Sequence, residues 1–141
     1  MLDTNICIHI RRARPLQVLE RFRSLKPGEV VMSPITLGEL LFGVEKIRDT
    51  PRFVEASRAL AELAQLIPTA PFDASTAGQY ALFRAKLQRA GQVIGNNDLW
   101  IAAHAAALDV TLVTDNTLEF DRLKPDLRVE NWATGVAGSA V

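Results

Sequence analysis

The stretch VVMSPITLGELLFGVEKI, residues 30–47, joins a short apolar run directly to a helical pattern. Its first three residues are apolar and have the length of a short strand. Ser33 and Pro34 follow, and this pair is typical of a helix N-cap and first helical position. From Leu37 to Ile47, apolar residues recur every three or four positions. The stretch therefore predicts a strand that leads immediately into a helix.

The same alternation of strand and helix extends over the rest of the chain. Further strand-length apolar runs lie at residues 1–3, 67–71, 110–113 and 127–129. Helical periodicity occupies the intervals, at 53–67, after the capping candidate Asp73 as far as Ala90, and at 98–108. This order predicts an α/β fold with a short, mostly parallel sheet of four to five strands flanked by helices. Ligands of such sheets gather beyond the carboxyl ends of the strands.

The composition is that of one ordinary globular domain. The chain has 141 residues, which is enough for a single hydrophobic core. Hydrophobic residues make up 48% and charged residues 23%, so the chain is expected to fold. We predict one domain over residues 1–132. The remaining residues, 133–141, are rich in Ala, Gly and Ser and are expected to form a flexible tail.

Charge and cysteine content say more about the surroundings of the protein than about its function. Lys plus Arg and Asp plus Glu number 16 each, so the net charge gives no sign of a nucleic-acid partner. The single cysteine, Cys7, stands between Ile6 and Ile8 and is interpreted as a small core residue. The most apolar stretch, residues 101–108, is too short to cross a bilayer. These features predict a cytoplasmic protein without membrane association.

Two aspartates follow predicted strands. Asp3 ends the first apolar run, and Asp115 ends the later run that begins at residue 110. Both are expected on the same edge of the sheet, where neighbouring Thr and Asn side chains can orient a carboxylate by hydrogen bonds. Each aspartate alone also has an ordinary explanation, because Asp is a preferred helix-capping residue.

Two further acids lack the countercharge that helical acids usually have. Glu45, Glu55 and Glu62 each have an arginine three or four positions away. Glu39 and Asp98 have apolar or small residues at those spacings on the helical side. An acid on an apolar face without a countercharge costs several kcal/mol if it stays ionised, and a bound cation would offset that cost. Asp98 is also expected in the first turn of its helix, where the helix dipole favours a carboxylate.

Other common catalytic patterns are missing from the sequence. His9 and His104 lack metal-ligand spacing to each other and have no nucleophile-triad context, so both are interpreted as structural. Gly91 and Gly95 are not followed by the Lys and Ser or Thr of a phosphate-binding loop. Nucleotide hydrolysis through such a loop is therefore not expected.

Taken together, the motifs resemble the PIN-domain ribonucleases, and within them the VapC toxins of bacterial toxin–antitoxin pairs. Each motif alone is weak, but four acids in register with suitable strands and helices are specific in combination. The matching segments run in order along residues 1–132: Leu2-Asp3-Thr4-Asn5; Ser33-Pro34-Ile35-Thr36-Leu37-Gly38-Glu39-Leu40 with Gly43 and Glu45; Ile94-Gly95 with Asp98, Ile101, Ala102 and His104; Thr114-Asp115-Asn116 with Glu119-Phe120; and Val129-Glu130-Asn131-Trp132.

The resemblance implies a PIN-like three-layer fold and a metal-dependent endoribonuclease. It implies that Mg²⁺ or Mn²⁺ is held by the carboxylates, and Mg²⁺ suits oxygen-only ligands. The expected reaction is hydrolysis of RNA phosphodiesters, in a structured RNA such as transfer RNA, to 5′-phosphate and 3′-hydroxyl ends. The catalytic and metal-binding acids of the family carry over to Asp3, Glu39, Asp98 and Asp115, with Asn5, Thr114 and Asn116 as supporting residues.

The resemblance also implies a homodimer and a VapB-type antitoxin, whose tail lies along a groove and places a basic side chain in the acidic site. The helices at 37–47 and 53–66 are candidate docking surfaces, although core packing alone accounts for their apolar residues. The residues expected to steer the RNA backbone are Arg11, Arg12, Arg14, Arg84, Lys86 and Arg89.

One departure from the family pattern concerns the first strand. Family members usually have a few more residues before the first aspartate, whereas only Met1 and Leu2 precede Asp3 here. Either the first strand is very short or the true start lies upstream. With this start, the terminal amine is expected near Asp3, where it could compete with a metal ion.

Two other functions remain open on the residues alone. A phosphatase with an aspartyl nucleophile would use Asp3, but such enzymes usually have a second Asp two positions later, where Asn5 stands. A non-catalytic nucleic-acid or protein binding module on the same fold is the other alternative, because fold does not imply function. Retention of all four acids favours the nuclease.

Overall fold

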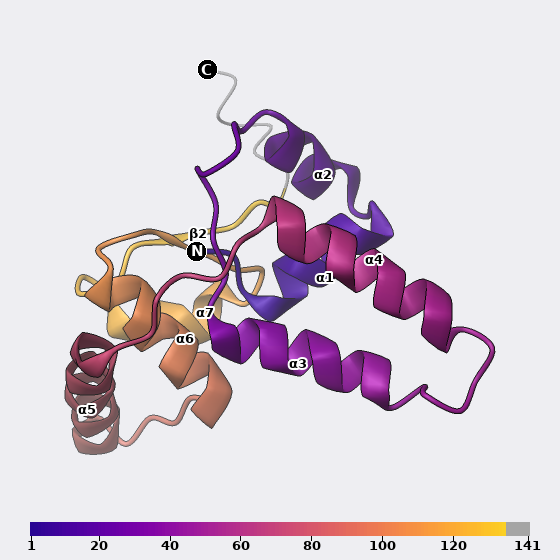
Figure 1. Cartoon of the computed structure of the whole chain (residues 1–141). Helices are drawn as coiled ribbons and strands as arrows, with labels where there is room; N and C mark the ends of the chain where they lie inside the picture. Colours follow the sequence, from indigo (N-terminus) through magenta and orange to yellow (C-terminus); the bar gives the residue numbers. More distant parts are fainter. Residues whose placement is uncertain (135–141) are drawn as a thin grey trace.

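The computed structural model describes residues 1–134 of the chain. Helices dominate it, and the two short strands lie late in the sequence (Figure 1). In chain order the elements are α1 (Thr4–Arg12), α2 (Leu16–Arg23), α3 (Pro34–Glu45), α4 (Phe53–Leu66), α5 (Ala74–Arg89), α6 (Asn96–Ala107), β1 (Leu112–Val113), α7 (Thr117–Phe120), the 3₁₀ helix η1 (Asp121–Leu123) and β2 (Val129–Glu130).

The sheet has fewer strands than predicted. Within residues 1–134, only β1 and β2 form a ladder, which is parallel with Leu112 opposite Val129. The prediction of four to five strands is therefore wrong. The other predicted strands make single parallel bridges, Leu2 with Val113 and Met32 with Thr69. Each is too short for a continuous ladder, since α1 begins at Thr4 and α3 at Pro34.

Backbone hydrogen bonds nevertheless align the five predicted segments side by side. The Leu2 amide donates to the Val31 carbonyl at 2.9 Å, and the Asp3 amide donates to the Val113 carbonyl at 3.0 Å. The amides of Met32 and Leu112 extend the layer outward, to the carbonyls of Pro68 and Arg128. The predicted parallel order of these segments is therefore present, carried by isolated bridges beside the one short ladder.

Helices cover both faces of this central layer. Figure 1 shows α5 and α6 on one side of the molecule and α3 and α4 on the other. Neighbouring residues of the layer alternate between two apolar clusters: Met1 and Leu112 belong to the cluster with α5 and α6, and Leu2 and Val113 to the cluster with α1 to α4. Side chains of extended backbone point alternately to opposite faces. The predicted three-layer α/β arrangement is confirmed.

Local capping signals place the helices that carry polar residues. The Ser33 hydroxyl accepts the Ile35 amide at 3.2 Å, and Pro34 occupies the first turn of α3. The Asp73 carboxylate accepts the Ser75 amide at 3.0 Å at the start of α5. Both predicted caps are confirmed. Because α6 begins at Asn96, Asp98 lies in its first turn as predicted.

The carboxyl-terminal end of the described chain still contacts the core. The side chain of Trp132 is buried, and the Ala133 amide donates to the Asn131 side chain at 2.7 Å. Most of the tail that the sequence predicts, residues 135–141, lies outside the described residues, so the boundary at residue 132 stays a prediction. None of the described helices is long and apolar enough to cross a membrane.

His104 is a fully buried histidine in the last turn of α6. One ring nitrogen, Nε2, lies 2.7 Å from the Pro71 carbonyl oxygen and must donate to it, because a carbonyl only accepts. The other, Nδ1, has no hydrogen-bond partner among the described residues. A charged imidazolium would need a second acceptor there, and burial lowers the pKa of His104 below its usual value.

This burial predicts a pH-dependent stability that a single substitution removes. In the unfolded chain His104 gains a proton near pH 6.5, whereas the folded state resists protonation. As the pH falls from 7.5 to 5, the free energy of unfolding of the wild type should therefore decline relative to His104→Gln, by at most about 1.4 kcal/mol per pH unit. Gln keeps a donor for Pro71 but does not titrate. Urea unfolding at each pH measures the difference, and parallel profiles would contradict the prediction.

Candidate active site

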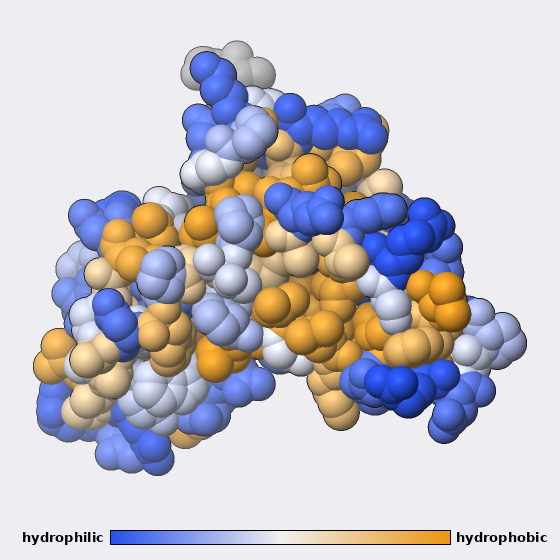
Figure 2. Space-filling view, in the orientation of Figure 1, coloured by the Kyte–Doolittle hydropathy of each residue, from blue (hydrophilic) through white to orange (hydrophobic). Residues whose placement is uncertain are grey.

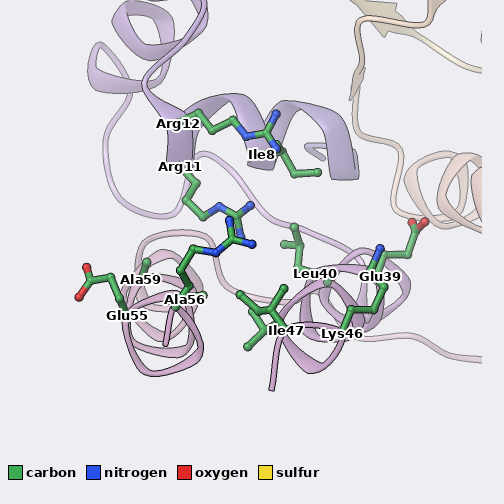
Figure 3. A pocket seen from close by; sticks show the side chains of 13 residues that line it. Ile8, Arg11, Arg12, Glu39, Leu40, Lys46, Ile47, Glu55, Ala56 and Ala59 are labelled. Atoms are coloured by element: carbon green, nitrogen blue, oxygen red, sulfur yellow. The ribbon is translucent and has the colours of Figure 1, made fainter. Parts of the chain in front are cut away.

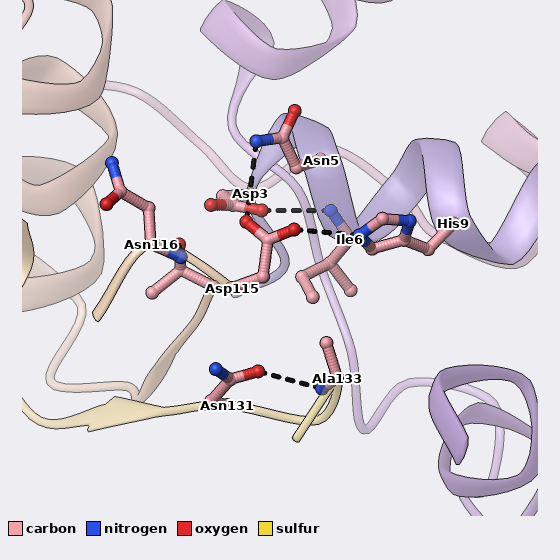
Figure 4. A network of polar contacts seen from close by, with 9 residues as sticks. Asp3, Asn5, Ile6, His9, Asp115, Asn116, Asn131 and Ala133 are labelled. Atoms are coloured by element: carbon pink, nitrogen blue, oxygen red, sulfur yellow. Dashed lines mark hydrogen bonds and ion pairs between the residues drawn. The ribbon is translucent and has the colours of Figure 1, made fainter. Parts of the chain in front are cut away.

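Asp3 and Asp115 lie next to each other at the carboxyl ends of adjacent segments. The bond between the Asp3 amide and the Val113 carbonyl sets this register. Asp3 is also the N-cap of α1, where its buried Oδ1 accepts the Ile6 amide at 3.0 Å (Figure 4). The two acids are thus together on one edge of the layer, as predicted from their positions after apolar runs.

Burial and neighbouring acids make the charge on Asp3 costly. Burial raises the pKa of Asp3 to about 6, and hydrogen bonds from Thr114 and the Ile6 amide oppose this rise. The carboxylates of Asp115 and Asp98 raise the pKa of Asp3 further. These three acids therefore lie close enough to repel one another, although they are far apart in the sequence.

Helix α1 holds the Asp115 carboxylate from one face. The Asn5 side-chain amide donates to Asp115 Oδ1 at 3.4 Å, and His9 Nε2 lies 2.8 Å from Asp115 Oδ2 (Figure 4). His9, interpreted as structural from the sequence, therefore contacts one of the predicted site acids. The spacing of residues 5 and 9 places both on one face of a helix that begins at an acid, but it does not identify Asp115 as their partner.

Glu39 and Asp98 meet at a second part of the site. Both line an open hollow of about 360 Å³ together with Gly95, Asn96 and Asn97. The Thr4 hydroxyl donates to Glu39 Oε1 at 2.7 Å, so the first turn of α1 also orients this acid. Glu39 makes no ion pair within residues 1–134.

A further acid, Glu119, was given no site role from the sequence. It accepts the Gly95 amide at 3.1 Å, and it also accepts the Asn116 side chain. Burial raises the pKa of Asp98 to about 6, with additional contributions from Glu119 and Glu39. Glu119 thus adds to the negative charge around the hollow and fixes the chain just before α6.

The acids do not form a preassembled cluster. Within residues 1–134, no three Asp, Glu, His or Cys side chains converge tightly enough to hold a metal ion as they stand. Asp3, Glu39 and Asp115 are instead engaged by hydrogen bonds from α1. The terminal amine is not beside Asp3 as expected, since it donates to the Thr111 carbonyl at 2.7 Å.

The basic residues predicted to contact RNA fall in two places. Arg11 and Arg12 line a groove of about 630 Å³ between α1, α3 and α4, which Glu39 and Lys46 also line (Figure 3). Arg84 and Lys86 lie on α5, where Arg84 donates to the Tyr80 hydroxyl and Lys86 pairs with Asp126 at 3.0 Å. Arg14 and Arg89 are exposed. The RNA role of all six stays a prediction.

Apolar side chains are exposed on the two helices proposed as docking surfaces. Leu41 and Phe42 of α3 are 49% and 63% exposed, and Val54 of α4 is 75% exposed. Figure 2 shows hydrophobic surface in the region of these helices, with hydrophilic residues around it. Core packing therefore accounts for only part of the apolar character of α3 and α4.

The fold and the acid-lined edge define the class of protein. The family model of the PIN domain matches residues 1–124, and the chain belongs to the PIN-domain family.

Within this family the chain is similar to curated VapC proteins over nearly its whole length. It is 36% identical over 132 residues to the ribonuclease VapC2 of Haemophilus influenzae, with 94% of this chain and 96% of the relative covered. It is 39% identical over 134 residues to the tRNA(fMet)-specific endonuclease VapC of Shigella flexneri, with 94% and 97% covered.

Solved structures agree with these relatives. A structure of VapBC-1 from nontypeable Haemophilus influenzae matches with a TM-score of 0.82 at 36% identity, covering 94% of this chain and 96% of that one. A structure of DNA-bound VapBC from Salmonella typhimurium matches with a TM-score of 0.84 at 33% identity, covering 94% and 96%.

Mutual repulsion at the site predicts that removing one charge stabilises the free protein. In EDTA at pH 7.5, Asp98→Asn should unfold roughly 2 to 5 °C above the wild type, the shift that about 1 kcal/mol produces in a domain of this size. Differential scanning calorimetry measures it. Asp49→Asn is the control, because Asp49 is exposed and has no ion pair among the described residues. Equal melting temperatures for wild type and Asp98→Asn would show that the acids do not repel.

Proposed function

We propose that the protein is the toxin of a toxin–antitoxin pair and acts as a Mg²⁺-dependent endoribonuclease. It hydrolyses phosphodiesters of a structured RNA, transfer RNA being the first candidate, to 5′-phosphate and 3′-hydroxyl ends. The observation that carries the proposal is the meeting of Asp3, Asp98, Asp115 and Glu39 at one edge of the layer. The naming of relatives as ribonuclease VapC and tRNA(fMet)-specific endonuclease VapC supports the choice of RNA.

The chemistry of these side chains fits a divalent cation. The four acids offer carboxylate oxygens only, which Mg²⁺ and Mn²⁺ prefer, whereas Zn²⁺ favours His and Cys. Burial and like charge raise the pKa values of Asp3 and Asp98 to about 6, so a nearby double positive charge would offset a cost already present. We propose Asp3, Glu39, Asp98 and Asp115 as the ligands.

The remaining polar residues prepare these ligands. When bound, a divalent cation supplies a water of lowered pKa near the phosphodiester and offsets the charge of the transition state. Asn5 and His9 fix the Asp115 carboxylate, and the Thr4 hydroxyl fixes Glu39. The Thr114 side chain forms a hydrogen bond with Asp3, and its hydroxyl accepts from the backbone amide of Asn116 at 3.0 Å. These hydrogen bonds would orient the carboxylates around the cation.

The groove between α1, α3 and α4 is the proposed binding surface for an antitoxin. Its floor includes the apolar residues Leu40, Val44 and Ile47, and Arg11, Arg12 and Arg52 are among its basic lining residues. An extended segment with apolar and acidic side chains is complementary to this surface. Because Glu39 lines the same groove, a basic side chain of that segment would reach the acids. A homodimer and residence in the cytoplasm belong to the same proposal.

Cleavage of a total transfer-RNA pool tests the activity directly. In Mg²⁺ the wild type should cut a few RNAs at discrete positions, leaving ends that a 5′-phosphate-dependent ligation captures. EDTA and Asp98→Asn should each reduce the rate by at least about a hundredfold. EDTA removes the cation and Asp98→Asn removes one of its proposed ligands, so in both cases the charge of the transition state is no longer compensated. Release of inorganic phosphate from p-nitrophenyl phosphate instead would favour the phosphatase.

Asp49→Asn serves again as the matched control and should cut like the wild type. Absence of discrete cuts at any protein concentration would overturn the nuclease and leave a binding module.

Cation binding can be measured without RNA. Adding 10 mM Mg²⁺ (roughly 10 to 100 times a millimolar to submillimolar Kd) should raise the melting temperature of the wild type by several degrees, since a ligand of the folded state stabilises it by mass action. Asp98→Asn should respond much less. Calorimetry in matched buffers gives both values, and an equal response of the two proteins would exclude Asp98 as a ligand.

A further inference from the structure

A chain of three polar side chains ends at the acid hollow. The Arg84 guanidinium donates to the Tyr80 hydroxyl at 3.0 Å, and the Tyr80 hydroxyl lies 2.9 Å from Asn96 Oδ1. Arg84 and Tyr80 belong to α5, and Asn96 begins α6. Asn96 lines the same hollow as Asp98 and Glu39. The proposed catalytic machinery uses none of these three residues.

The direction of this chain follows from the chemistry of its members. Arginine can only donate, so the tyrosine oxygen accepts from Arg84. The single hydroxyl proton of Tyr80 is then available for Asn96 Oδ1, which can only accept. With its oxygen accepting from Tyr80, the Asn96 side chain has its Nδ2 group left to donate elsewhere.

Aromatic packing holds the tyrosine in place. The Tyr80 ring stacks on Trp100 with centroids 3.8 Å apart and planes 10° from parallel. Trp100 lies one helical turn after Asn96. The ring of Phe72 also packs near Trp100, with the two ring centroids 5.6 Å apart. The hydroxyl is therefore presented from a rigid side chain with little rotational freedom to lose.

The amide side chains of Asn96 and Asn97 are the neutral donors that line the hollow, and only that of Asn96 is held by Tyr80. The lining of the hollow also includes the carboxylates of Glu39 and Asp98, and one backbone donor there, the Gly95 amide, already bonds Glu119. A phosphate entering the hollow meets negative charge, and a neutral amide donor can bind its oxygen without taking a metal-binding carboxylate away. Asparagine and asparagine-like donors commonly position nucleic-acid backbones in this way.

We propose that Asn96 donates to a phosphate oxygen of the bound RNA strand, and that Tyr80 and Arg84 are positioning residues that orient its amide. This inference rests on the proposed ribonuclease function and names a substrate contact within it. Since the contact is made to bound RNA before and during cleavage, it should affect RNA binding and KM more than kcat.

Steady-state cleavage of the transfer RNA that the wild type cuts provides the first test. Tyr80→Phe keeps the ring and its stack but removes the hydroxyl, and Asn96→Ala removes the donor. Each should raise KM roughly three- to tenfold with kcat within about twofold, as expected for loss of one hydrogen bond. The double variant should be no worse than Asn96→Ala, because both changes remove the same contact.

Binding without cleavage provides a second readout. Fluorescence anisotropy with 3′-fluorescein-labelled bulk transfer RNA in EDTA should show the same loss of affinity for Tyr80→Phe and Asn96→Ala. Gln88→Ala removes an exposed amide of α5 that has no hydrogen bond among the described residues, and it should bind like the wild type. Thermal unfolding of each variant checks that the fold is unchanged.

The outcomes separate this inference from the proposed function. If the wild type cuts RNA and both single variants keep its KM and affinity, the Asn96 contact is wrong and the nuclease stands. Additive losses in the double variant would overturn the role of Tyr80 in orienting Asn96. If the wild type binds RNA without cutting it, the nuclease fails while the anisotropy series still decides the contact. Absence of both RNA cleavage in Mg²⁺ and RNA binding overturns both.

Discussion

The position of the first acid depends on a few backbone hydrogen bonds made by residues 1–3. The Leu2 amide donates to Val31 on one side, and the Asp3 amide and Met1 carbonyl bond Val113 on the other. These bonds fix the start of α1, and thereby the direction in which Thr4, Asn5 and His9 point. The side chain of Leu2 is fully buried in the cluster with α1 to α4, and that of Met1 is buried in the cluster on the other face. The positions of Asp3 and of the α1 side chains at the acid edge therefore depend on these hydrogen bonds.

The acid edge itself is built from charges that the fold tolerates at a cost. Asp3 is buried, and Asp98 has Glu119 and Glu39 as neighbours, so both carboxylates are harder to ionise than usual. Groups of α1 contact the acids of this edge: the Ile6 amide donates to Asp3, the Thr4 hydroxyl donates to Glu39, and the Asn5 side chain and the His9 ring contact Asp115. Functional sites often retain such unfavourable electrostatics, because the same groups are needed to bind a cation or stabilise developing charge.

Much of this arrangement was accessible from the sequence, and the missing parts share one cause. The caps at Ser33 and Asp73 and the first-turn position of Asp98 depend on residues close in the chain, and the edge shared by Asp3 and Asp115 follows from strand order. The strand count was wrong because one or two paired residues do not make a ladder, and pairing length depends on when each helix begins. The contact of His9 with Asp115 spans 106 positions, and the chain from Arg84 through Tyr80 to Asn96 joins two helices. Periodicity within one element carries no information about such pairings.

Glu39 belongs to two recesses at once. It lines the acid hollow beside Asp98 and also the groove between α1, α3 and α4 (Figure 3). An occupant of the groove is therefore already in contact with a wall of the hollow, and it can block the acids by direct competition, with no conformational signal through the core. A change at the middle of α3 alters both surfaces together. A sequence change at this part of α3 therefore cannot alter the groove without also affecting the acid site.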